Sequence, residues 1–145
     1  MNERFIGVFW EALKAAKKRQ RESLVFSSID ETRSISVSSI SHFVINDHIV
    51  KVYYNNEVFD FTSTMTKICE LLHSNENFVR IHRSTLINIA YIASFGRKMV
   101  VMRNSDRFVV SRNYIGDLKA AIKRWPYLHS EIVFLAWHRK RKSEM

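Results

Sequence analysis

The sequence predicts a mainly β domain made of short strands, with one short inserted helix and helical extensions at both ends. Period-two alternation of β-branched and aromatic residues recurs in short runs between Ser23 and Val110. Turn-forming residues, such as the "NN", "GRK" and "NSD" segments, separate these runs. The 145 residues suit one domain with extensions, and three Gly and one Pro are too few for a long flexible linker.

The first predicted element is an amphipathic helix over residues 1–22. Phe5, Phe9 and Leu13 recur at helical spacing, and the segment ends in the charged run "KKRQRE". The sequence leaves open whether this helix packs on its own domain, forms a dimer or connects to a missing partner.

Strands follow between Ser23 and Phe61. "RSISVSSI" alternates, and "HFVIN" and "IVKVYY" are rich in β-forming residues. Asn55-Asn56 suits a tight hairpin turn, because Asn tolerates positive φ. Thr62 or Ser63 is the expected N-cap of a short helix in "FTSTMTKICELLH", in which the only cysteine is expected to be a packed thiol.

The segment "FVRIHRSTLINI" carries polar residues at alternate positions of a strand. His82 is expected to be a hydrogen-bonded structural histidine, and Asn88 a buried turn-former. The strands "YIASF", "MVVM" and "RFVV" come next, and then a helix that begins at Ser111 and ends or kinks at Pro126. Residues 125–145 form a predicted extension with a solvated basic tail.

The charge distribution gives the first indication of function. The net charge is +9, and between Phe78 and Arg112 there are seven basic residues and a single acid, Asp106. Six of these seven are arginine, which suits planar, bidentate contact with phosphates and guanine edges. A solubilising face would intersperse the two signs, so this segment favours an anionic partner.

Catalytic and membrane functions are not indicated. The six histidines form no HExxH motif, no cysteine pair or carboxylate cluster is present, and the isolated glycines form no phosphate-binding loop. We therefore expect no enzyme activity, cofactor or metal. A DNA-binding helix-turn-helix and an RNA-recognition motif also fit badly. A single cysteine, no apolar run of membrane-spanning length and no signal peptide lead us to expect a cytoplasmic protein.

Two segments in order, "FVRIHRSTLINIAYI" and "MVVMRNSDRFVVSRNYIGDLKAAI", resemble the C-terminal part of the LytTR DNA-binding domain. That family is recognised by "F-x-R-x-H-R-S-x-[IVL]-[IV]-N" followed by "V-S-R-x-Y-x-x-x-L". Upstream, "ISVSSISHFVINDHIVKVYY" is similar to the first strands of the family, and "TMTKICELLHSNENF" to its helix. The resemblance implies that residues 23–124 are an elongated DNA-binding domain of small antiparallel sheets, whose loops enter successive major grooves, usually at direct repeats in bacterial promoters.

The resemblance also implies which residues contact DNA. Base-directed contacts fall on His48, Arg83 and Arg112. Weaker candidates for contact with the DNA backbone are Asn113, Arg80, Arg97 and Lys98. Simpler interpretations remain open, because His48 can be a turn residue, Arg83 a solvated charge at a strand edge, and Arg112 a residue that caps the helix.

The expected function is therefore sequence-specific binding of double-stranded DNA by a bacterial transcriptional regulator, nucleoid-associated when bound. Many family members carry a receiver domain before the DNA-binding domain, and the residues before Ser23 are too few for one. We expect a terminal extension to mediate homodimerisation or to bind a regulatory protein instead. The alternative is a LytTR-like protein-interaction module that sequesters a regulatory partner.

Overall fold

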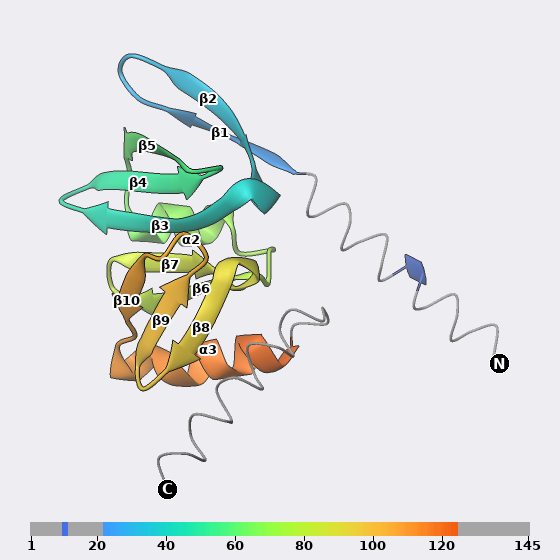
Figure 1. The fold of residues 1–145 in the computed structure, drawn as a ribbon. Coiled ribbons are helices and arrows are strands. Elements are labelled where there is room, and N and C mark those ends of the chain that lie inside the picture. Colours follow the sequence, from blue (N-terminus) through green and yellow to red (C-terminus); the bar gives the residue numbers. More distant parts are fainter. Residues whose placement is uncertain (1–9, 12–21, 125–145) are drawn as a thin grey trace, which may run out of the picture. The chain divides into compact units, whose positions relative to one another are not determined.

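The computed structural model describes residues 10–11 and 22–124. Trp10 and Glu11 are helical, but the remainder of the helix expected at the N-terminus, the C-terminal extension and Pro126 lie outside the described residues. The chain divides into two compact units, residues 1–40 and 41–145. Figure 1 labels the elements.

The described part of the first unit is a hairpin followed by a short 3₁₀ helix. Strands β1 (Ser23–Ser27) and β2 (Thr32–Ser36) pair antiparallel, and η1 covers Val37–Ser39. The alternation in "RSISVSSI" was expected to be strand throughout, but the strand ends at Ser36. The Ser39 hydroxyl donates to the Ser36 carbonyl at 2.7 Å, and such local bonds compete with strand pairing.

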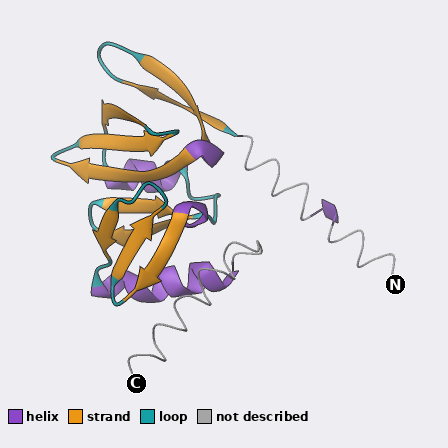
Figure 2. Ribbon diagram, viewed as in Figure 1, coloured by secondary structure: helices purple, strands orange, loops and turns teal. Residues whose placement is uncertain are grey.

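The second unit contains the larger sheet, which has five strands in the order β5-β4-β3-β7-β6. Its pairs β4–β5, β3–β7 and β6–β7 are antiparallel. The sheet and its connections are coloured by type in Figure 2. The strands are β3 (Ile40–Asn46), β4 (Ile49–Tyr54), β5 (Glu57–Thr62), β6 (Phe78–His82) and β7 (Thr85–Asn88).

The second unit also contains a three-stranded antiparallel sheet of order β10-β9-β8 and the helix α3. After the 3₁₀ helix η2 (Ile89–Tyr91) come β8 (Ile92–Gly96), β9 (Met99–Met102), β10 (Arg107–Val109) and α3 (Arg112–Arg124). The helix begins just after Ser111, as expected. The fold of the described residues is mainly β with small antiparallel sheets, which confirms the predicted fold class.

The core of the second unit joins β6 and β7 to the smaller sheet and α3. Apolar side chains from all of these elements are buried, and Leu118 of α3 is fully buried. The cluster consists of Val79, Ile81, Ile87, Ile89, Ile92, Phe95, Val100, Met102, Val110, Leu118, Ala121 and Ile122. This packing holds the first turn of α3 beside the hairpin that carries Arg83.

The inserted helix is α2, at Met65–Leu71. Its N-cap is Thr64, whose hydroxyl accepts a hydrogen bond from the Lys67 amide at 3.2 Å. The expected cap, Thr62 or Ser63, was therefore wrong by one or two positions. Thr62 still belongs to β5 and pairs with Ile49, so the strand continues closer to the helix than the sequence pattern indicates.

Three tight turns have both central residues in the left-handed region. They are Asp47-His48, Asn55-Asn56 and Arg97-Lys98, with φ between 46° and 68°. This conformation matches the twist of paired strands, and it confirms the turn predicted at Asn55-Asn56.

Candidate nucleic-acid interface

Backbone hydrogen bonds join the turns that carry the expected base-contacting residues. The Ile45 amide at the end of β3 donates to the Ser84 carbonyl in the β6–β7 turn at 2.8 Å. The Ser111 amide, just before α3, donates to the Ile81 carbonyl of β6, also at 2.8 Å. In space, the β6–β7 turn therefore lies next to the β3–β4 turn on one side and next to the start of α3 on the other.

A third bond adds the β8–β9 turn to this group. The Val110 amide donates to the Lys98 carbonyl at 2.6 Å. Figure 1 shows the three turns and the start of α3 along one side of the second unit, at the left of the view. The β4–β5 turn with Asn55-Asn56 lies at the opposite end of its strands.

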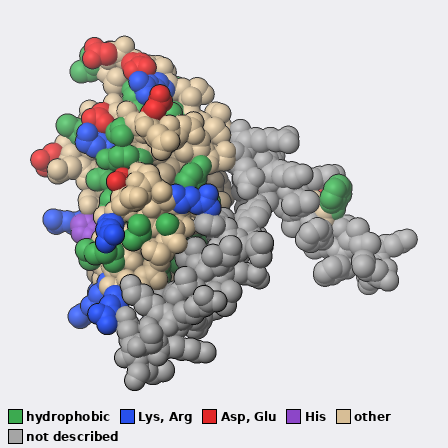
Figure 3. Space-filling model, viewed as in Figure 1, with side chains coloured by type: hydrophobic (Ala, Val, Ile, Leu, Met, Phe, Trp, Pro, Cys, Tyr) green, Lys and Arg blue, Asp and Glu red, His purple; other side chains and the backbone are tan. Residues whose placement is uncertain are grey.

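These turns and the start of α3 carry a set of exposed polar side chains that we call the basic rim. It brings together six of the seven residues expected to contact DNA, and all six are exposed. In Figure 3, Lys and Arg side chains gather over the β6–β7 turn and the start of α3. The basic rim consists of His48, Arg83, Arg97, Lys98, Arg112 and Asn113.

Arg80, the seventh residue, is half-buried in β6 and bonds to its own hairpin. Its Nε donates to the His82 carbonyl at 3.2 Å and its Nη2 to the Arg83 carbonyl at 2.9 Å. Its guanidinium also lies 5.4 Å from the centre of the Tyr114 ring on α3.

His82 and Asn88 have the structural roles that were expected of them. The Ser84 amide donates to His82 Nδ1 at 3.2 Å, and the Ser84 hydroxyl lies 2.8 Å from the same nitrogen. Asn88 is buried, and its side-chain oxygen accepts a hydrogen bond from the Ala90 amide at 3.0 Å. Both bonds fix the ends of β7, next to the rim at one end and η2 at the other.

A fully buried histidine, His42, connects β3 to the β9–β10 turn. Its ring stacks on Tyr53 at 4.3 Å and meets the edge of Phe108 at 5.0 Å. Its Nδ1 lies 2.8 Å from the Ser41 hydroxyl, and its Nε2 lies 3.2 Å from Asp106 Oδ2 without the alignment of a hydrogen bond. Burial lowers the pKa of His42 to about 4, although the Asp106 carboxylate opposes the shift.

The Ser41, His42 and Asp106 side chains have the composition of a hydrolytic triad but cannot act as one. The imidazole is fully buried and Ser41 nearly so, which leaves a substrate no access to the hydroxyl. We interpret this group as structural.

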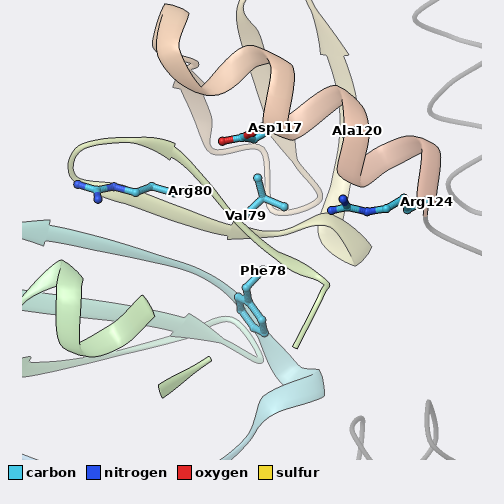
Figure 4. A pocket seen from close by; sticks show the side chains of 6 residues that line it. All are labelled: Phe78, Val79, Arg80, Asp117, Ala120 and Arg124. Carbon is cyan, nitrogen blue, oxygen red and sulfur yellow. The ribbon is translucent and has the colours of Figure 1, made fainter. Parts of the chain in front are cut away.

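A pocket of about 260 Å³ lies between β6 and α3 (Figure 4). Its lining residues are Phe78, Val79, Arg80, Asp117, Ala120 and Arg124. The Arg80 side chain extends along its strand toward the hairpin turn rather than into the pocket. Within the described ranges, no group of three or more His, Cys, Asp or Glu side chains could hold a metal ion.

Sequence reasoning missed Tyr114 and Ser84, which hold the rim together. Tyr114 stands in the "V-S-R-x-Y" element, so the motif marked its position but not its contact with Arg80. Ser84 follows Arg83 and bonds both to His82 and to Ile45. No periodicity predicts the contacts with Arg80 and Ile45, because each joins elements that are far apart in the sequence.

A β unit with exposed arginines on adjoining turns has the features of a nucleic-acid-binding domain that uses loops rather than a recognition helix. Comparison with known proteins identifies the family. The model of the LytTr DNA-binding domain matches residues 30–123. The chain belongs to the LytTR family of DNA-binding domains.

Two known proteins illustrate this relationship. The chain is 31% identical over 98 residues to the sensory transduction protein LytR of Staphylococcus saprophyticus. That match covers 59% of this chain and 39% of the relative, so the chain spans about two fifths of the relative's length. The solved LytTr DNA-binding domain of a response regulator from Bacillus cereus matches with a TM-score of 0.60 and 18% identity. It covers 69% of this chain and 95% of that one, and it supports the fold.

No helix in residues 10–11 or 22–124 has both the length and the apolar character needed to cross a membrane.

Proposed function

We propose that the protein is a transcriptional regulator that binds duplex DNA in a sequence-specific manner through its basic rim. The observation that carries this proposal is the set of three backbone bonds that join the β3–β4, β6–β7 and β8–β9 turns to the start of α3. His48, Arg83 and Arg112 would contact base edges. Asn113, Arg97 and Lys98 would lie near phosphates.

The spacing of the strands fits a major groove. The sheet order β4-β3-β7-β6 separates the midpoints of the two hairpins by two strand spacings. That distance is about 10 Å, and the major groove of B-DNA is about 12 Å wide. Adjacent hairpin turns carrying His48 and Arg83 could therefore enter the same groove.

The start of α3 suits the same role. Arg112 is exposed at the first position of this 13-residue helix, and the first turn contains no acidic residue. The partial positive charge of a helix N-terminus favours a nearby phosphate. An Arg side chain there can reach a guanine O6/N7 pair, a contact worth roughly 1–3 kcal/mol of discrimination.

Family membership supports a DNA partner, and the whole regulator's activity is inferred from it. We propose that two such domains bind direct repeats in a promoter, with dimerisation or a regulatory contact supplied by the terminal extensions. Action in the cytoplasm follows from this role.

The proposal is tested with a duplex enriched by the full chain from a randomised library. Fluorescence anisotropy would compare binding to this duplex and to a scrambled one, over a range of salt concentrations. Affinity should fall steeply with salt, and Arg83→Ala and Arg112→Ala should each reduce the preference for the enriched duplex by roughly 5- to 150-fold.

Arg124→Ala is the matched control. Arg124 is also exposed on α3, but it lies about 18 Å from Arg112 along the helix axis. It removes the same charge and should leave the preference unchanged. Equal effects of the two substitutions on both duplexes would mean that charge alone matters. Weak, sequence-indifferent binding by the wild-type chain would favour the protein-interaction alternative.

A further inference from the structure

The β6–β7 turn differs from the other two-residue turns of its unit. Neither Arg83 nor Ser84 has a positive φ, whereas both central residues do in the β3–β4, β4–β5 and β8–β9 turns. Two-residue turns with positive φ match the twist of the flanking strands, whereas two-residue turns with negative φ splay the strands apart. The turn that presents Arg83 therefore needs restraints from outside its own backbone.

Side chains supply these restraints. Arg80 donates from Nε and Nη2 to the carbonyls of His82 and Arg83, at 3.2 and 2.9 Å. The strand register shifts between Arg80 and His82, which removes regular pairing where the guanidinium bonds are made. Figure 4 shows the Arg80 side chain reaching along β6 to the turn.

The Arg80 guanidinium also contacts the first turn of α3, which carries Arg112. Its carbon lies 5.4 Å from the centre of the Tyr114 ring, two residues after Arg112 in the first turn of α3. The Ser111 amide, just before α3, also donates to the carbonyl of Ile81, the residue after Arg80 in β6. One planar group therefore links the carbonyl of Arg83 to the helical turn that carries Arg112.

We infer that Arg80 is a positioning residue that sets the spacing between Arg83 and Arg112. This inference rests on the proposed function. A planar fork with several fixed donors can hold two carbonyls and stack on a ring at once, whereas the single ammonium of a lysine cannot. The role differs from phosphate contact, in which only the charge and its reach matter.

The test compares Arg80→Lys with Arg103→Lys in the full chain. Arg103 is the matched control, because its guanidinium also lies over a tyrosine ring, at 5.8 Å from the centre of Tyr91, in the β9–β10 turn. Binding is measured to the library-enriched duplex, to single-base variants of it and to a scrambled duplex. Urea unfolding of each variant is measured in parallel.

A positioning role predicts that Arg80→Lys reduces discrimination at the base pair read by Arg83 by roughly tenfold. Binding to the scrambled duplex and the salt dependence should be unchanged, and Arg103→Lys should have neither effect. Adding Arg80→Lys to Arg83→Ala should cause little further loss, because the two side chains act as a unit. Amide resonances of residues 82–84 and 112–114 should shift together in DNA-free Arg80→Lys.

Three results would overturn the inference while leaving the proposed function intact. Arg80→Lys could leave discrimination unchanged, or its effect could add fully to that of Arg83→Ala. Alternatively, Arg80→Ala could reduce binding to all duplexes evenly and lower the salt slope by about 0.9, as loss of one phosphate contact does. If the wild-type chain itself shows no sequence preference, the proposed function fails and this inference fails with it.

Discussion

The buried histidine His42 makes the stability of the domain depend on pH. Its pKa in the folded protein is about 4, compared with an ordinary value of 6.5. Between these two pH values the unfolded chain binds a proton at this ring and the folded chain does not, so stability falls as the pH falls. The shift corresponds to roughly 3 kcal/mol, at 1.36 kcal/mol per pH unit.

The loss of folding stability begins as the pH falls through 6.5, the ordinary pKa, and is complete below 4, the pKa in the folded protein. Lowering the pH from 7 to 5 should reduce the free energy of unfolding by about 2 kcal/mol through His42 alone. The folded ring is held neutral because it is fully buried, stacked on Tyr53 and against the edge of Phe108. The Asp106 carboxylate offsets only part of the cost of burying the protonated ring.

Urea unfolding at pH 7 and pH 5 measures this change, with His42→Phe as the comparison. Phe keeps an aromatic ring between Tyr53 and Phe108 and removes the titrating group, so its pH-dependent loss should be smaller by about 2 kcal/mol. An NMR titration of the His42 ring provides an independent measurement. A midpoint near 6.5, or the same pH dependence in both proteins, would refute the reasoning.

Three further substitutions test separate parts of the fold, and urea unfolding at pH 7 measures each. Leu118→Ala removes a fully buried side chain under α3 and should cost about 2–5 kcal/mol; a loss below 1 would show that this core is loosely packed. Thr64→Ala removes the N-cap bond of α2 and should cost about 1 kcal/mol, whereas no loss would assign the cap elsewhere. At Asn56, φ is 61°, and Asn tolerates this left-handed conformation because its polar side chain can form local hydrogen bonds. Asn56→Ala removes the polar group and should lower the free energy of unfolding by about 1 kcal/mol, whereas Asn56→Gly should not lower it. Equal effects of the two substitutions would contradict the turn assignment.

Much of the fold could be predicted because its local signals are strong. Asn55-Asn56 specifies a left-handed turn by residue type alone, and the apolar face of α3 follows from the spacing that buries Leu118 and Ala121. The 3₁₀ turn after Ser36 was missed because period-two alternation runs on into it through Val37 and breaks only at Ser39. Serine hydroxyls that bond to nearby groups decided the outcome there.

The site could be predicted only in part. Residue type and the family motif indicated which side chains belong to it, but not which of them bond within the protein. Arg80 and Arg83 look equivalent in "FVRIHRS", yet Arg83 is exposed whereas Arg80 bonds to two carbonyls and approaches Tyr114. That difference depends on the register shift in β6 and on α3, some thirty residues away, which no local pattern encodes.

Methylation protection of guanine N7 tests most directly whether side chains on adjoining turns contact base edges in one duplex. Dimethyl sulfate reacts at N7 in the major groove, where a bidentate arginine would shield it. On a library-enriched duplex we expect wild-type protein to protect discrete guanines, Arg83→Ala to expose one and Arg112→Ala to expose another, and Arg124→Ala to protect all of them. Identical protection by all four proteins, or no protected guanine despite tight binding, would contradict the account.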